Sequence, residues 1–307
     1  MSADPLPSWN DGAAKSAILD FVARIATQGS PDFVAPAERI AAFDDEGTLW
    51  CEQPFQVQFH FARDRLDALA RSDPELKRNA LFRGCLEQDR DVIAMFGKKG
   101  LRELAGFARA GMAEDEVAAC ARDWVANGRH LNLGRPLNTL TYVPQVELVG
   151  YLRAKGFKIF IVSDGDVDLV RAIAGELYGI PPEQVIGSSA RTRLEFRECR
   201  GEVVRQQERD SFDGGGAKPA TIHQHIGRRP TLAFGNSDGD LDMLRQCTSG
   251  PGARLGLILH HDDAGREFAY DRDFRLDPLA RALDQADEYG ITLVSMMDDW
   301  NTVFDDA

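Results

Sequence analysis

The spacing of apolar residues changes along the chain and predicts two kinds of region. Residues 13–26 have apolar positions at helical spacing, and residues 39–43 form a short apolar run typical of a buried strand. From residue 144 onward, helical segments alternate with short apolar runs. Strands are expected at residues 158–162, 184–188, 231–234, 254–259 and 291–295, with a hairpin over 191–206 that turns near Arg200 and Gly201. This alternation predicts an α/β fold with a parallel sheet covered on both faces.

Residues 55–130 have a different apolar pattern. Their apolar positions are spaced as in helices, and no runs of β-branched residues interrupt them. Prolines and glycines cluster at both ends of the segment, near Glu52–Pro54 and Gly134–Pro144. Such clusters are typical of domain boundaries. We therefore expect a helical domain of residues 54–134, inserted into a core made of residues 1–53 and 135–307.

Composition narrows the classes of partner. The chain has 307 residues, of which 43% are hydrophobic, and its net charge is −13. This charge argues against nucleic acid and anionic membrane surfaces as main partners, and a phosphorylated substrate would need local positive charge. The five cysteines are scattered without a C-x-x-C pair, and no apolar run reaches the ~18 residues of a membrane span. We expect a cytoplasmic protein. The sequence leaves open an exported form whose signal peptide was removed, and it does not indicate an oligomeric state.

Polar residues follow three of the expected core strands. Because the carboxyl ends of parallel strands meet at one edge of a sheet, these residues are expected to converge. Alone, each group reads equally well as an ordinary polar turn. The three groups are Asp44-Asp45-Glu46 after Phe43, Ser163-Asp164-Gly165-Asp166 after Val162, and Gly235-Asn236-Ser237-Asp238-Gly239-Asp240 after Phe234. Lys218 begins a helix between the last two groups. Carboxylates, a hydroxyl and an ammonium at one edge meet the needs of phosphoryl transfer.

The order and spacing of these groups resemble the haloacid dehalogenase-like hydrolase superfamily, within its phosphoserine-phosphatase-like branch. The first motif of that family, Asp-x-Asp-x-Thr after an apolar strand, is matched by Asp44-Asp45-Glu46-Gly47-Thr48. A strand-ending Ser or Thr is matched by Ser163, a lysine by Lys218, and the acidic last motif by Gly235 to Asp240. The resemblance covers residues 39–244 and implies a Rossmann-like three-layer core with a helical cap inserted after the first motif.

The resemblance also implies a Mg²⁺-dependent mechanism through a phosphoaspartate. By position, Asp44 attacks phosphorus, and Glu46 protonates the leaving oxygen and later activates water. Lys218 neutralises Asp44 and the phosphoryl oxygens. The positions expected to bind the phosphoryl group are Thr48, Ser163, Asp164, Gly165 and Lys218. Those expected at the metal are Asp44, the Glu46 backbone carbonyl, Asn236 and Asp240.

Two positions depart from the family pattern. Glu46 stands where these hydrolases carry Asp, so its carboxyl is one methylene longer. Asn236 replaces the first Asp of the last motif, which keeps an oxygen ligand but removes a negative charge. The sequence leaves open whether Asn236 or Asp240 is the direct metal ligand. The histidines of His260-His261-Asp262-Asp263 are expected in a loop at the rim of the cleft, since adjacent strand residues face opposite ways.

These observations predict a phosphoric monoester hydrolase for a small phosphorylated metabolite. A hydrolase of pyrophosphate or of a phosphonate on the same core is the nearest alternative in chemistry. An alternative of another class is a non-catalytic member that binds a phosphorylated ligand, with Glu46 and Asn236 as signs of lost chemistry.

Overall fold

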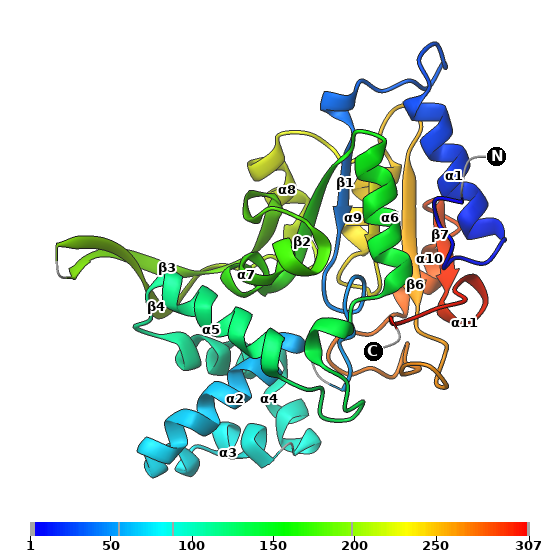
Figure 1. Ribbon diagram of the computed structural model, residues 1–307. Helices are drawn as coiled ribbons and strands as arrows, with labels where there is room; N and C mark the ends of the chain where they lie inside the picture. Colours follow the sequence, from blue (N-terminus) through cyan, green and yellow to red (C-terminus); the bar gives the residue numbers. More distant parts are fainter. Residues whose placement is uncertain (1–3, 55, 88, 198, 306–307) are drawn as a thin grey trace.

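The centre of the molecule is a sheet to which the described residues contribute seven strands (Figure 1). The computed structural model describes residues 4–54, 56–87, 89–197 and 199–305. The strands are β1 (Ile40–Phe43), β2 (Lys158–Asp166), β3 (Val185–Arg197), β4 (Arg200–Ser211), β5 (Leu232–Gly235), β6 (Leu255–His260) and β7 (Ile291–Ser295). Their order is β4-β3-β2-β1-β5-β6-β7, and every neighbouring pair is parallel except β3 and β4. The predicted parallel α/β sheet is therefore confirmed, with one antiparallel strand at its edge.

Helices cover both faces of this sheet, which gives the core three layers (Figure 1). They are α1 (Ala13–Ala26), α6 (Val143–Ala154), α7 (Val167–Tyr178), α8 (Ala217–Ile226), α9 (Leu241–Thr248), α10 (Arg281–Gln285) and α11 (Met296–Asp299). Successive side chains of β1 alternate between two apolar clusters. Ala41 and Phe43 pack in the cluster of α1, α6 and α7, whereas Ala42 packs in that of α8 and α9. Burial on both faces explains why β1 is continuously apolar.

Four further helices lie between β1 and β2 in the sequence and form a group beside the carboxyl edge of the sheet (Figure 1). They are α2 (Val57–Ser72), α3 (Ala80–Glu87), α4 (Arg90–Arg109) and α5 (Glu114–Asn127). We call this group the helical insertion. Three of these helices share a small apolar core of their own, formed by Ala62, Leu66, Leu81, Cys85, Leu104, Ala105 and Ala108. Helix α4 is interrupted at Gly97, which adopts a φ of 58°. Short 3-10 segments span Pro36–Glu38, Pro74–Arg78, Leu137–Thr139 and Pro182–Gln184.

Strands β3 and β4 form a long hairpin and differ from the prediction in two ways. The expected strand 184–188 and the first arm of the hairpin are one continuous strand, and the turn precedes Arg200 because Arg197 pairs with Arg200. The sequence did not show that the two are continuous, since a two-stranded ribbon outside the core needs no apolar pattern. The hairpin also contacts the helical insertion, where Gly111 N–H donates to the Arg205 carbonyl at 2.9 Å.

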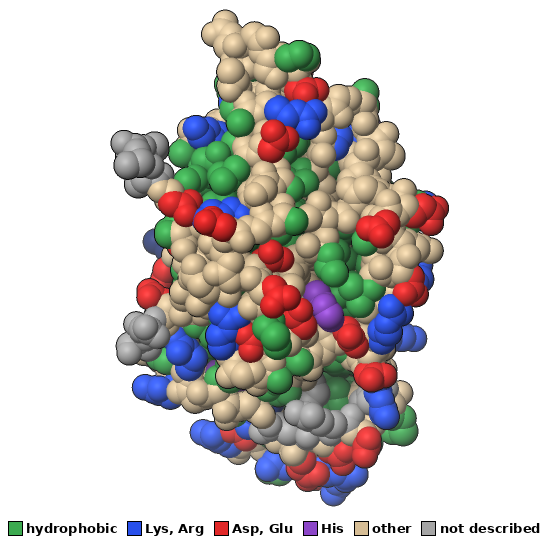
Figure 2. Space-filling view, turned by 90° about the vertical axis from the view of Figure 1, so that its right-hand side faces the viewer, with side chains coloured by type: hydrophobic (Ala, Val, Ile, Leu, Met, Phe, Trp, Pro, Cys, Tyr) green, Lys and Arg blue, Asp and Glu red, His purple; other side chains and the backbone are tan. Residues whose placement is uncertain are grey.

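The surface carries charges of both signs. On the face shown in Figure 2, acidic and basic side chains alternate rather than gather by sign. None of the helices in the described ranges combines the length and the apolar character needed to cross a bilayer.

Candidate active site

The turn after β1 presents Asp44 at the carboxyl edge of the sheet. Asp44 N–H donates to the Phe234 carbonyl of β5 at 2.9 Å, which ties the turn to the neighbouring strand. The Asp45 carbonyl then accepts the N–H groups of the next turn, including that of Thr48 at 3.1 Å. Gly47 has a φ of 78°, and a Cβ at this position would lie 2.1 Å from the Asn236 amide nitrogen. Only glycine therefore allows the first and last motifs to approach this closely.

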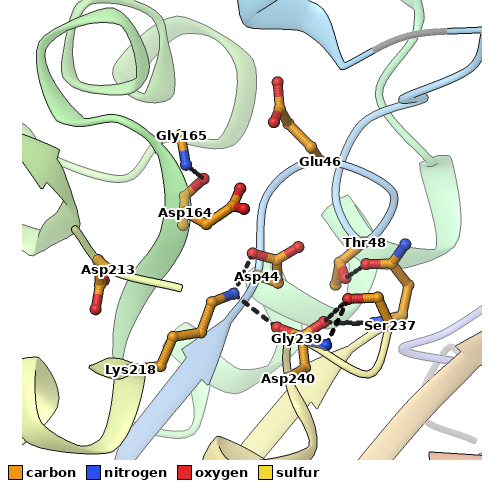
Figure 3. Close-up of polar contacts among 12 residues, drawn as sticks. Asp44, Glu46, Thr48, Asp164, Gly165, Asp213, Lys218, Ser237, Gly239 and Asp240 are labelled. Atoms are coloured by element: carbon orange, nitrogen blue, oxygen red, sulfur yellow. Dashed lines mark hydrogen bonds and ion pairs between the residues drawn. The ribbon is translucent and has the colours of Figure 1, made fainter. Parts of the chain in front are cut away.

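Lys218, the lysine of the predicted motifs, contacts residues of both the first and the last motif (Figure 3). Its Nζ lies 2.6 Å from Asp44 Oδ1 and 2.6 Å from Asp240 Oδ1. Burial would lower the pKa of Lys218, but the carboxylates of Asp240, Asp44 and Asp164 outweigh burial and raise this pKa well above its usual value. The side chain is therefore a buried cation between two carboxylates.

Asp240 organises the last motif, and hydrogen bonds engage both of its oxygens. Oδ1 accepts from Lys218, while Oδ2 accepts from Asn236 N at 3.0 Å, Ser237 N at 3.1 Å and the Ser237 hydroxyl at 3.3 Å. The side chain is fully buried. Asp240 thus holds the turn and the lysine in place.

Asn236 and Thr48 contact each other directly. The fully buried Thr48 hydroxyl donates to Asn236 Oδ1 at 3.1 Å, and Asn236 Nδ2 donates to Glu52 Oε1 at 2.9 Å. The hydroxyl proton of Thr48 is therefore directed at an amide oxygen, and its role toward a phosphoryl oxygen stays a prediction.

The Glu46 carboxylate points away from that of Asp44 (Figure 3). It accepts from the backbone N–H of Gln58 at 3.1 Å and from Gln58 Nε2 at 3.3 Å, at the start of α2. A side chain of the helical insertion therefore holds the predicted acid–base residue.

The second motif lies opposite the first. Strand β2 continues past Val162 to Asp166, so the motif forms the end of the strand rather than the loop after it. The Ser163 hydroxyl is buried and accepts from Gly165 N at 3.0 Å. The Asp164 carboxylate pairs with Arg102 of α4 at 3.2 Å, and it lies beside Asp44 and Lys218 in Figure 3.

A cavity of about 620 Å³ lies between α4 and the strands β2, β3 and β4. Gln58, which contacts Glu46, and Asp164, whose charge acts on Asp44, both line it. The side chains of Lys99 and Arg102 bring positive charge to the same wall of α4. The volume is in the range of sites for small molecules.

Two carboxylates of the first motif, those of Asp44 and Asp45, are protonated more readily than free ones. Burial and the charge of Asp240 raise the pKa of Asp44 well above its usual range, against the effect of Lys218. Burial also raises the pKa of Asp45 to about 6, although Tyr178 donates to its carboxylate at 3.0 Å. Asp45 thus faces Tyr178 of α7 rather than the other site carboxylates.

The donor set suits Mg²⁺. Asp44 and Asn236 offer side-chain oxygens, and hard oxygen donors are the ligands this ion prefers. Among the residues described, no three His, Cys, Asp or Glu side chains are grouped as a metal site. A site built from a carboxylate, an amide and a backbone carbonyl does not require such a group. Of the predicted ligands, Asp240 fits least well because hydrogen bonds engage both of its oxygens.

Sequence reasoning missed the contacts of Glu52 and His261, which are buried behind the first motif, and of Tyr270, which is partly buried. Glu52 accepts from Tyr270 OH at 2.9 Å as well as from Asn236, and His261 Nε2 lies 2.8 Å from the Gly47 carbonyl. The expected rim loop is wrong for His261, which is buried, because the chain after β6 folds back under the turn. No motif in the sequence marks these contacts.

Comparisons with known proteins show the family and similar folds. A family model described as haloacid dehalogenase-like hydrolase matches residues 41–245. A functionally unknown protein from Anaerococcus prevotii is similar in structure, with 15% identity, a TM-score of 0.54, and coverage of 87% of this chain and 94% of that one. A protein of unknown function from Bordetella pertussis has 14% identity, a TM-score of 0.53, and coverage of 84% and 98%. No curated protein matches. The span of the family match shows that this chain belongs to the haloacid dehalogenase-like hydrolase family.

Proposed function

We propose that this hydrolase is a Mg²⁺-dependent phosphatase that cleaves a small phosphoric monoester through a phosphoaspartate on Asp44. The observation that carries the proposal is the position of Lys218, 2.6 Å from both Asp44 and Asp240 at the carboxyl edge of the sheet. A buried ammonium beside a carboxylate is suited to stabilise the negative charge of a phosphoryl group during transfer.

In the first step, an oxygen of Asp44 forms a bond to phosphorus as the bond from phosphorus to the leaving oxygen breaks. Glu46 gives its proton to that oxygen, so the products are the phosphorylated Asp44 and a free alcohol. The contact of Glu46 with Gln58 supports this role, because Gln58 lines the cavity that would receive the leaving group. A positioned acid of this kind lowers the barrier to bond cleavage.

In the second step, water attacks the same phosphorus and the bond to Asp44 breaks. Glu46, now a carboxylate, takes the proton of the attacking water, and inorganic phosphate leaves. Lys218 stays beside Asp44 and neutralises the phosphoryl oxygens, and Ser163 lies at the end of the neighbouring strand to bind one of them. Each residue thus returns to its starting state.

Asp44, the Glu46 carbonyl and Asn236 would hold Mg²⁺, and Asp240 would support them from behind. The bound ion would neutralise charge on the transferred group, which is its usual contribution to phosphoryl transfer. Because Asn236 replaces an aspartate of the family motif, Asp44 is the one carboxylate among these proposed ligands.

Residues 54–134 are proposed to act as the cap of this site. The Arg102 side chain pairs with Asp164 at the site and lies over the ring of Phe212, 3.9 Å from its centroid. Because the insertion forms one wall of the 620 Å³ cavity, it would exclude bulky substrates and limit water around the reacting groups.

Phosphate release from a set of phosphorylated metabolites tests the proposal. The set includes pyrophosphate and a phosphonate, and each compound is assayed with Mg²⁺ and with a chelator. We expect release from at least one monoester, dependent on Mg²⁺ and absent from Asp44→Asn. Release from pyrophosphate or the phosphonate alone would favour the alternative chemistries. Binding of phosphorylated compounds without any turnover would contradict the proposal.

A further inference from the structure

A chain of buried hydrogen bonds runs behind the first motif, outside the groups used in the proposed steps. Tyr270 OH donates to Glu52 Oε1 at 2.9 Å, and Asn236 Nδ2 donates to the same oxygen at 2.9 Å. At the other end of the amide, Thr48 donates to Asn236 Oδ1 at 3.1 Å. Glu52 is 1% exposed, Asn236 3% and Thr48 not at all.

The two ends of the Asn236 amide have nearly the same shape but opposite hydrogen-bonding properties. The oxygen can bind a cation, whereas the nitrogen can only donate. An aspartate at this position would have an oxygen at both ends and would need no orientation. An asparagine therefore needs a neighbour that distinguishes its ends if it is to serve as a metal ligand.

Glu52 makes this distinction. Its Oε1 accepts from the nitrogen of the amide, which leaves the amide oxygen facing Thr48. The Thr48 hydroxyl can both donate and accept, so Thr48 alone does not fix the amide. A Cβ on Gly47 would lie 2.5 Å from Glu52 Oε1, which shows how closely this carboxylate approaches the turn.

We propose that Glu52 is a positioning residue that directs the Asn236 oxygen at the metal site. The inference rests on the proposed function, since it concerns the Mg²⁺ of that site. A residue behind a ligand commonly governs both the orientation of that ligand and the affinity for the metal.

The alternative is that Glu52 only stabilises the fold through Tyr270 and Asn236. A charge exchange between the two positions separates these accounts. The variants are Glu52→Gln, Asn236→Asp and the double variant that carries both changes. Glu147→Gln is the matched control, because Glu147 pairs with Ser8 instead of a site residue. The affinity for Mg²⁺ is measured by titration calorimetry, and the melting temperature of each metal-free protein shows that it is folded.

We expect Glu52→Gln to weaken Mg²⁺ binding about 10- to 100-fold, as for other residues that support a metal ligand. Asn236→Asp places two buried carboxylates in contact and should lower the melting temperature of the metal-free protein. The double variant has one carboxylate and one amide again, with the carboxylate on the ligand, and should bind Mg²⁺ at least as tightly as wild type. The control should bind Mg²⁺ as wild type does.

A folded Glu52→Gln protein with wild-type Mg²⁺ affinity would overturn the role of Glu52 and leave the proposed function intact. The same conclusion would follow if the double variant bound Mg²⁺ as weakly as Glu52→Gln. Should Glu52→Gln fail to fold, Glu52→Asp, which withdraws the carboxylate by one methylene, provides the same comparison. A wild-type protein that binds no Mg²⁺ would overturn both this inference and the proposed function.

Discussion

The Lys218 ammonium lies 2.6 Å from the Asp44 carboxylate, although 174 positions separate the two residues in the chain. Asp44 directly follows strand β1, and α8 brings Lys218 to the same edge of the sheet. The second carboxylate on this lysine, Asp240, lies at the same distance. A single side chain therefore pairs with two buried carboxylates, and its removal should affect both the chemistry and the site's geometry.

Replacing Lys218 with alanine should lower kcat by on the order of 10²-fold or more, because a preorganised charge next to the phosphoryl group is lost. Lys15→Ala is the matched control, since Lys15 is also buried and paired with two carboxylates, those of Asp4 and Asp11, but outside the site. The control should lose stability and keep its kcat. Steady-state kinetics and thermal unfolding of both variants check this prediction, and an unchanged kcat in Lys218→Ala would show that Lys218 is structural.

Removing the Glu46 carboxyl should reduce the rate by ~10²–10⁴-fold, the usual contribution of a general acid. Glu46→Gln should be nearly as damaging as Glu46→Ala, since neither side chain carries the proton. Glu46→Asp restores the shorter acid of the family and should keep measurable activity. If wild-type Glu46 protonates the leaving group well but activates water poorly, rapid-quench measurements should show that phosphoenzyme accumulates. Equal rates in all four proteins would mean that Glu46 takes no part in proton transfer.

Asp166 connects the core, the hairpin and the helical insertion. Its carboxylate lies 3.0 Å from Arg109 of α4 and 2.6 Å from Arg205 of β4. Burial would raise the pKa of Asp166, but the two arginines outweigh burial and lower it below its usual 3.8. Because the folded-state pKa is lowered, the stabilisation is complete above 3.8 and is lost as the pH falls through the folded-state pKa.

Asp166→Asn should therefore lower the free energy of unfolding by about 3 to 5 kcal/mol near neutral pH, as expected when one partner of a buried ion pair is removed. The difference from wild type should shrink as the pH falls below 3.8. Urea unfolding across this range gives the comparison, with Glu195→Gln as a control that should change little, because Glu195 is only partly buried and its ion pairs lie at the surface. A difference that stayed constant with pH would argue against the ionic contribution.

The strands of the sheet could be predicted from the sequence because the apolar pattern of a strand depends only on neighbouring residues. Buried strands such as β1 and β5 are continuous apolar runs, and the residues after them share one edge by the rules of parallel sheets. The length of the β3–β4 hairpin could not be predicted, since a solvated ribbon leaves no apolar pattern.

The same limit applies to the site. Asp44, Lys218 and Asp240 could be found because each follows or begins a recognisable element. The contact between Glu52 and Asn236 joins residues 184 positions apart and depends on side-chain orientation, which spacing does not encode. The direction of the Thr48 hydroxyl also depends on side-chain orientation, so it could not be predicted from spacing. Such contacts become visible only after the backbone has been folded.

The central claim, a phosphoryl group carried on Asp44, is tested most directly by trapping the intermediate. Wild-type protein is mixed with a substrate found in the phosphate-release assay, quenched in acid within one turnover, and analysed by peptide mass spectrometry; Asp44→Asn, in which the nucleophilic carboxylate becomes an amide, is treated in parallel. We expect one phosphoryl group on the peptide that contains Asp44 in wild type and none in Asp44→Asn. A phosphoryl group on another residue, or turnover by Asp44→Asn at the wild-type rate, would contradict the account.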